Sequence, residues 1–236
     1  MTNQCAAQGC GMATKGFGIY CNAHSKRNIR HGHPLQLGIT KGDLTGYRKE
    51  VRRFLDGRAD REAWDKATDR LRLVAERCVE TVRLYEGGRA MNRWEVQAAR
   101  LFLSVWQDVD PKTIIETAAA MGMMLQSEPG RFWSDKAFLA QVARRFAGLT
   151  DRNAGTWWND TTQQVHRVYR DIAPRTAVIL GRTVHVAVGV IGCQIVKVQT
   201  ERERAEREAR NAMFAALASG EAVLDPKQSA GEAANV

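Results

Sequence analysis

The sequence predicts a mostly α-helical protein with a small metal-binding module at its N-terminus, and three observations support this fold class. Residues that favour helices are frequent, and the 236 residues include only 5 prolines. Apolar residues recur at steps of three and four over long segments after residue 46. Finally, four side chains of the kind that bind metal ions lie within the first 24 residues.

The predicted metal-binding module spans residues 1–34. Its ligands follow the pattern Cys5-x4-Cys10, then ten residues, then Cys21-x2-His24. One pair of ligands lies on a glycine-rich turn and the other at the start of a helix, which together offer four donors to one tetrahedral ion. Three thiolates and one imidazole suit a closed structural Zn²⁺ site, and the ion would supply much of the folding free energy of so short a segment. We therefore expect one structural zinc ion in a treble-clef-like module.

The rest of the chain is divided into a linker at 35–46, an α-helical bundle domain at 47–218 and a disordered tail at 219–236. Asn92 and Ser134 are suitable helix N-caps, and Pro111 suits the first turn of a helix. Residues 148–160 are predicted to form a loop that carries Trp157 and Trp158. The predicted helices span 58–85, 92–107, 111–126, 134–147, 161–172, 175–198 and 199–218.

The segment 175–198 admits two interpretations. Its β-branched residues suit a hairpin, whereas its length, Pro174 at its start and the helical run after it favour a buried helix with glycines for close packing. We prefer the helix. The final helix, 199–218, carries oppositely charged residues four positions apart and is expected to be long and solvent-exposed.

The charge of the chain points to a polyanionic partner. The net charge is +9, and residues 1–58 hold ten Lys and Arg against three acidic residues. Positive charge of this kind favours phosphates, because contact with them releases condensed counterions. The alternative is a solvated basic face on a structural module. The predicted nucleic-acid contacts are Lys26, Arg27, Arg30, His31, His33, Arg48, Lys49, Arg52 and Arg53.

The module resembles a small zinc module of phage and prophage proteins that often precedes an HNH endonuclease domain. The resemblance is carried by Cys5-AAQG-Cys10, by Tyr20 before Cys21-NA-His24, and by the run RNIRHGHP at 27–34. It implies that Cys5, Cys10, Cys21 and His24 bind zinc, that the protein is phage-encoded, and that DNA is a more suitable partner than RNA. The resemblance covers about thirty residues.

Three functions follow from these patterns. The leading one is a non-enzymatic, zinc-containing nucleic-acid-binding protein, such as a regulator of transcription or DNA metabolism. The second is an interaction factor that binds a host machine such as RNA polymerase or a nuclease. The third is an HNH-like endonuclease, for which Asn28, His31 and His33 are the candidate residues, because only His166 and His185 follow them.

The remaining polar and reactive residues have structural interpretations. Cys78 and Cys193 lie in apolar contexts typical of core residues, and His185 is expected to be buried and hydrogen-bonded. The two tryptophans of the predicted loop would either stack on bases or pack on the core. The first residues lack the basic-then-apolar pattern of a signal peptide, and the apolar stretch 176–198 is interrupted by polar residues. We therefore expect a cytoplasmic protein without a membrane partner.

Overall fold

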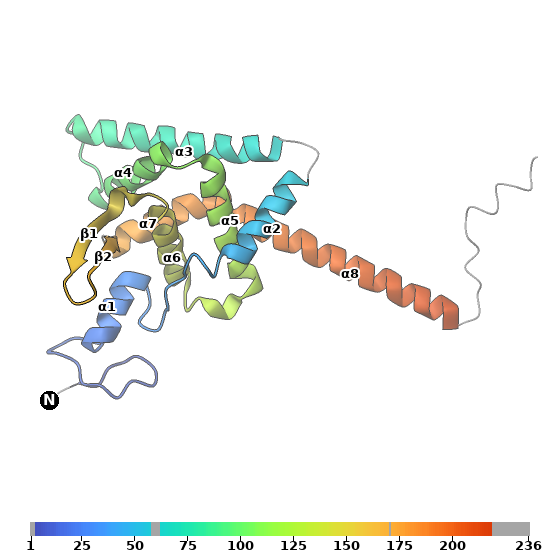
Figure 1. The fold of residues 1–236 in the computed structure, drawn as a ribbon, viewed down its shortest axis with the longest axis horizontal. Helices are drawn as coiled ribbons and strands as arrows, with labels where there is room; N and C mark the ends of the chain where they lie inside the picture. The colour runs from blue at the N-terminus through green and yellow to red at the C-terminus, as the bar shows by residue number, and fades with distance from the viewer. Residues whose placement is uncertain (1–2, 58–61, 170, 219–236) are drawn as a thin grey trace, which may run out of the picture. The chain divides into compact units, whose positions relative to one another are not determined.

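The computed structural model describes residues 3–57, 62–169 and 171–218 and is mostly helical (Figure 1). The chain divides into two compact units, Met1–Ile195 and Val196–Val236. The elements are α1 (Asn22–His31), α2 (Thr45–Asp56), α3 (Glu62–Glu86), α4 (Arg93–Asp108), α5 (Pro111–Ser127), η1 (Pro129–Arg131), α6 (Asp135–Ala147), η2 (Asp151–Asn153), β1 (Ala154–Asn159), β2 (Gln164–Tyr169), α7 (Pro174–Val184), η3 (His185–Gly189) and α8 (Val190–Ala218).

The ends of three helices confirm the predicted capping signals. The side chain of Asn92 accepts a hydrogen bond from the backbone N–H of Trp94 at the start of α4, and Ser134 accepts one from Ala137 at the start of α6. Pro111 occupies the first turn of α5, where its missing N–H is not needed. These signals are local, because each cap acts within its own turn.

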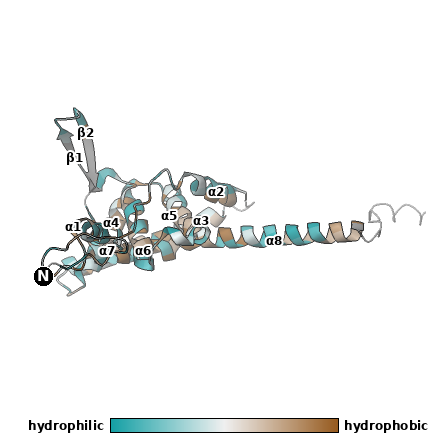
Figure 2. Cartoon of the chain, turned by 90° about the horizontal axis from the view of Figure 1, so that it is seen from below, coloured by the Kyte–Doolittle hydropathy of each residue, from teal (hydrophilic) through white to brown (hydrophobic). Residues whose placement is uncertain are grey.

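The core of the first unit is built around α5. Residues 114–124 are all buried, because α5 packs against α2, α3, α6 and η3. Helix α7 packs between α4 and α6, and Phe102 of α4 stacks on Phe146 of α6 with ring centroids 5.3 Å apart. Figure 2 shows hydrophobic (brown) and hydrophilic (teal) residues mixed along the helices, as expected of amphipathic helices that bury one face. The predicted α-helical bundle is confirmed.

The segment 175–198 is helical, as preferred, and its glycines permit close contact between helices. A Cβ atom on Gly192 would overlap the carbonyl oxygen of Ala119 in α5, and one on Gly181 would overlap that of Leu139 in α6. The π-helical turn η3 lies between α7 and α8 and packs on α5. Small residues therefore set the spacing of α5 and α6 from this helical stretch.

The predicted loop and the predicted helix 161–172 are replaced by a β-hairpin, so these two assignments are wrong. Strands β1 and β2 pair antiparallel, with Ala154 opposite Tyr169 and Asn159 opposite Gln164. In the turn, Asn159 accepts hydrogen bonds from the backbone N–H groups of Thr161 and Thr162, and Gln163 adopts a φ of 53°. Two aromatic and β-branched runs joined by an Asn-Asp turn favour a hairpin over a helix.

Residues 35–46 do not form a free linker. Gln36, Ile39 and Leu44 are buried, and the amide of Gln36 donates to the carbonyl of Arg131 while its oxygen accepts from the N–H of Trp133. These hydrogen bonds let a turn-rich segment lie against the helices with its polar groups satisfied. The segment is therefore part of the first compact unit, and α2 begins at Thr45.

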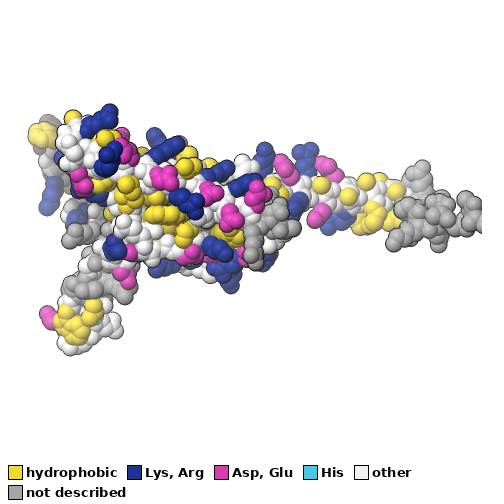
Figure 3. Space-filling view, turned by 90° about the horizontal axis from the view of Figure 1, so that it is seen from above, with side chains coloured by type: hydrophobic (Ala, Val, Ile, Leu, Met, Phe, Trp, Pro, Cys, Tyr) yellow, Lys and Arg dark blue, Asp and Glu magenta, His cyan; other side chains and the backbone are white. Residues whose placement is uncertain are grey.

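The described part of the second unit is the helical segment 196–218 of α8. Figure 3 shows basic and acidic side chains alternating along it, and Arg204 donates to Glu208 one turn later over 2.8 Å. This confirms the predicted helix. The predicted tail at 219–236 lies outside the described residues.

The stretch Pro174–Leu217 contains a window apolar enough to cross a membrane by length and composition, but half of that window is buried inside the protein.

The close approach at Gly192 makes a testable prediction. We expect Gly192→Ala to lower the free energy of unfolding by at least about 2 kcal/mol, because a methyl group would force α5 and α8 apart. Gly46→Ala is the matched control, since its added methyl meets nothing within 4 Å and should raise helix stability by up to about 1 kcal/mol. Denaturant unfolding measures both. Equal stability of the two variants would contradict the packing described.

Candidate metal centre

The N-terminal module begins with a tight knuckle held by backbone hydrogen bonds. Cys5 donates its N–H to the carbonyl of Met12 over 2.9 Å, and Cys10 donates to Ala7 over 3.0 Å. Gly9 adopts a φ of 76°, a left-handed conformation that glycine enters without a Cβ penalty. The knuckle therefore brings Cys5 and Cys10 to the same side of the turn.

The second pair of ligands lies at the start of α1. Cys21 is the N-cap residue of this helix, and the N–H of Ser25 donates to its carbonyl over 2.8 Å. His24 is one turn further along and faces the same side as Cys21. The predicted combination of a glycine-rich turn and a helix start is confirmed.

The four donor atoms converge on one point and could hold a metal ion. They all lie within 4.8 Å of one another. The Nδ1 atom of His24 is 3.5 Å from the sulfur of Cys5 and 3.3 Å from that of Cys21, and the sulfurs of Cys10 and Cys21 are 4.0 Å apart. Donors about 2.3 Å (sulfur) and 2.0 Å (nitrogen) from a tetrahedral ion are separated by about 3.5–3.8 Å. The spacing therefore fits a tetrahedral site.

The surroundings of Cys5 favour its thiolate. Burial raises the pKa of this thiol, but hydrogen bonds from the backbone of Cys21 and Ala7, together with His24, outweigh burial and lower the pKa to about 6. Cys5 and Cys21 are buried beside Ala7, and Tyr20 and Leu35 cover them. Four protein ligands fill a tetrahedral site, so this arrangement suits a structural ion and leaves no position for a substrate.

The end of α1 joins the module to the helical body. Gly32 has a φ of 83°, and a Cβ atom there would lie 2.8 Å from the carbonyl oxygen of Lys136, at the start of α6. Next to it, the Nδ1 atom of His31 is 2.9 Å from the amide nitrogen of Gln141. Burial and the charges of Arg144, Arg30 and Arg27 lower the pKa of His31 to about 4. This histidine is therefore neutral near pH 7.

Two further side chains of the same run contact the body. Arg30 donates two hydrogen bonds of 3.0 Å to the carboxylate of Asp171, and the ring of His33 stacks on Trp133 with centroids 5.3 Å apart. The N–H of Leu35 also donates to Nδ1 of His33 over 3.2 Å. Arg30, His31 and His33, which were predicted to contact nucleic acid, thus have partners within the protein.

The four basic residues of α2 differ in their contacts. Arg48 and Arg52 bind the buried carboxylate of Glu116 over 2.9–3.0 Å. Burial raises the pKa of Glu116, but the two guanidinium groups lower it below its ordinary value. Lys49 and Arg53 are exposed on the same helix. In the module, Lys26 is exposed and Arg27 is half-buried.

Residues 12–19, which follow the knuckle and which we call the apolar tip, carry exposed apolar side chains that the sequence patterns did not indicate. Phe17 is fully exposed, at 105% of its reference area, and Met12 and Ile19 are about two-thirds exposed. The run Lys15-Gly-Phe-Gly18 was the available signal, because an aromatic residue between glycines in a tight turn has no core to enter. Exposed apolar side chains mark interaction sites where they form a contiguous patch, so these three residues, close in sequence, are candidate contacts for a partner.

The remaining cysteines, histidines and tryptophans that the sequence indicated lie in the helical body and in the hairpin. Cys78 is buried, as predicted, and the sulfur of Cys193 contacts the carbonyl of Gly122 at 3.5 Å. His185 differs from the prediction: it meets Phe138 edge-on at 4.9 Å, and its Nδ1 atom has no hydrogen-bond partner among the described residues. Trp158 is half-exposed in β1, whereas the side chains of Trp157 and His166 lie outside the described ones.

Comparisons of the chain with protein-family models, with curated proteins and with solved structures find no match.

Metal binding can be tested by counting ions. We expect the purified protein to hold one metal ion per chain, and Cys10→Ser to reduce this content strongly, because a hydroxyl is a poor replacement for a thiolate ligand. Cys193→Ala is the matched control and should keep the metal, since Cys193 lies in the helical body. Elemental analysis after gel filtration measures both. A protein without bound metal, or equal loss in the two variants, would contradict the assignment.

Proposed function

We propose that this protein is a zinc-dependent, non-enzymatic nucleic-acid-binding protein, encoded by a phage or prophage and acting in the cytoplasm. The observation that carries the proposal is the exposure of Phe17 and of two lysines, Lys15 and Lys26, in and beside the segment that holds the four candidate ligands. The metal centre would hold this segment in place.

Zinc is the metal we propose for the centre. Three cysteines and one histidine form a donor set typical of structural zinc sites, and the distances between the donor atoms suit a tetrahedral ion. A structural role agrees with the size of the module, since Cys5, Ala7 and Cys21 are its only buried apolar residues among those described before residue 32. So small a core needs the ion to stay folded.

The charge distribution supports a phosphate-bearing partner. The first acidic residue of the chain is Asp43, whereas five Lys and Arg precede it. A site of three thiolates and one Zn²⁺ would contribute about −1, which leaves the segment positive. Since Arg30 binds Asp171, we assign the phosphate contacts to Lys15, Lys26 and Arg27.

Phe17 suggests the form of the nucleic acid. Aromatic side chains stack on bases that are not paired, and this stacking does not depend on sequence. The resemblance of the module favours DNA over RNA. We therefore propose single-stranded DNA as the first ligand to test, with Lys49 and Arg53 of α2 as further candidate contacts.

A second candidate function rests on the same tip. Met12, Phe17 and Ile19 would also suit an apolar pocket on a host protein such as RNA polymerase or a nuclease. The third function, an HNH-like nuclease, is not favoured by the contacts of its candidate residues, because His31 contacts Gln141 and His33 stacks on Trp133.

Binding to a labelled single-stranded DNA tests the proposal. Three phosphate contacts predict that affinity falls about 20-fold between about 50 and 200 mM salt, and chelation should abolish binding. We expect Phe17→Ala to weaken binding about tenfold, because one stacked base contributes about 1–3 kcal/mol. Lys26→Glu should also weaken it and should reduce the salt dependence. Fluorescence anisotropy measures all four effects.

Matched controls separate these effects from general damage. Phe214→Ala and Lys197→Glu change an exposed aromatic and an exposed lysine of α8, and should leave DNA affinity unchanged. A DNA affinity that changes neither with salt concentration nor with chelation would contradict the proposal. A different result would instead establish the second function. In that case the protein does not bind DNA but retains a purified host protein after nuclease treatment, and Phe17→Ala loses this retention.

A further inference from the structure

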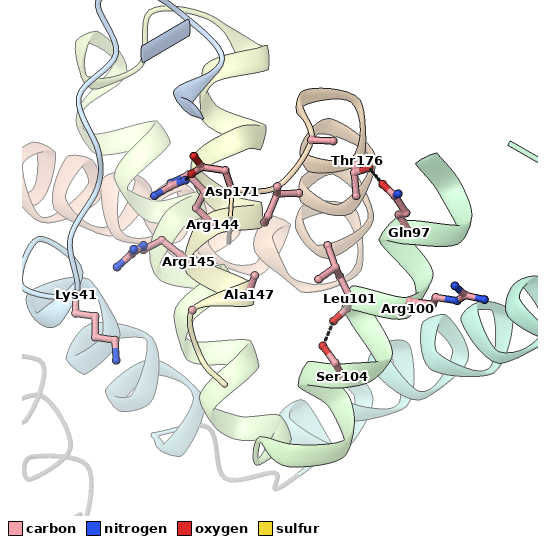
Figure 4. A pocket seen from close by; sticks show the side chains of 13 residues that line it. Lys41, Gln97, Arg100, Leu101, Ser104, Arg144, Arg145, Ala147, Asp171 and Thr176 are labelled. Carbon is pink, nitrogen blue, oxygen red and sulfur yellow. Dashed lines mark hydrogen bonds and ion pairs between the residues drawn. The ribbon is translucent and has the colours of Figure 1, made fainter. Parts of the chain in front are cut away.

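A cavity of about 580 Å³ lies in the helical body, and none of the four candidate metal ligands lines it (Figure 4). Its walls come from α4, from the C-terminal end of α6 and from the segment 171–176 that leads into α7. This volume lies within the range of about 300–1,000 Å³ typical of sites that bind small molecules. All of its lining residues belong to the first compact unit.

The lining combines aliphatic surface with cationic side chains. Leu101 and Ala147 face the middle of the cavity in Figure 4, and Lys41, Arg144 and Arg145 lie on one side of it. Such a site offers a hydrophobic surface for the body of a ligand and donors for an anionic group.

The carboxylate in the wall is already engaged by the module. Asp171 accepts two hydrogen bonds of 3.0 Å from Arg30, whereas Arg144 reaches the same carboxylate only at 3.4 Å. The Arg144 side chain is only 25% exposed, so its charge has lost much of its hydration. Burial accordingly lowers the pKa of this guanidinium. Two cations share one carboxylate here, and a second anion would relieve this imbalance.

We propose that this cavity binds a small organic anion with an aliphatic body, whose carboxylate or phosphate head meets Lys41 and Arg144 and whose body packs on Leu101. The aliphatic lining favours an alkyl body over a flat aromatic one, since no aromatic side chain lines the described part of the cavity. None of the residues that line this site belongs to the four candidate metal ligands or to the proposed nucleic-acid contacts.

Isothermal titration calorimetry with octanoate and with hexyl phosphate tests the proposal on the full chain. At least one of them should bind with a Kd below about 1 mM, and at least about tenfold more tightly than its separate parts. The parts are acetate and 1-octanol for octanoate, and inorganic phosphate and 1-hexanol for hexyl phosphate. The tighter of the two ligands identifies the head group. Failure of both, or equal binding of the alcohols, overturns the proposal.

Two pairs of variants locate the binding. Leu101→Glu places a carboxylate inside the cavity and should weaken anion binding at least about tenfold, whereas Leu73→Glu alters an exposed leucine of α3 and should not. Lys41→Glu should weaken binding similarly, with Lys197→Glu as its control. Both lysines are exposed, so this second pair tests the site even if Leu101→Glu fails to fold. Equal affinity within the pairs overturns the site.

Discussion

The close approach of Gly32 to the start of α6 is the constraint on which the placement of the metal-binding module, and with it the candidate site, depends. A left-handed residue without a Cβ atom lets the end of α1 lie directly on the backbone of Lys136 and Ala137. Once this contact forms, His31 reaches Gln141 and Arg30 reaches Asp171. The candidate metal centre at the other end of α1 is thereby attached rigidly to the helical body.

This attachment changes the interpretation of the basic run at 27–34. In the sequence, its arginines and histidines resemble a phosphate-binding turn, yet most of them stabilise the junction between module and body. The proposed nucleic-acid contacts therefore move to Lys15, Phe17 and Lys26, which are exposed. Asp171 links the junction to the cavity, because it binds both Arg30 and Arg144.

Features set by neighbouring residues could be predicted from the sequence, and features set by distant partners could not. The spacing of Cys21 and His24, and the caps at Asn92 and Ser134, act within one turn, so pattern alone located them. Arg52 and Glu116 are 64 positions apart, and no local sequence pattern predicts their ion pair. Residues 35–46 likewise appear to be a linker until Gln141 supplies an acceptor for the N–H of Ile39.

The measurement that tests this account most directly is the unfolding free energy of Gly32→Ala relative to Gly88→Ala. Both glycines have a φ above 80°, but only Gly32 has backbone atoms within 4 Å of an added Cβ, so the comparison isolates the close approach. We predict that Gly32→Ala costs at least about 2 kcal/mol more than Gly88→Ala, while one metal ion per chain is retained. Equal costs in the two variants would contradict the rigid attachment of the module.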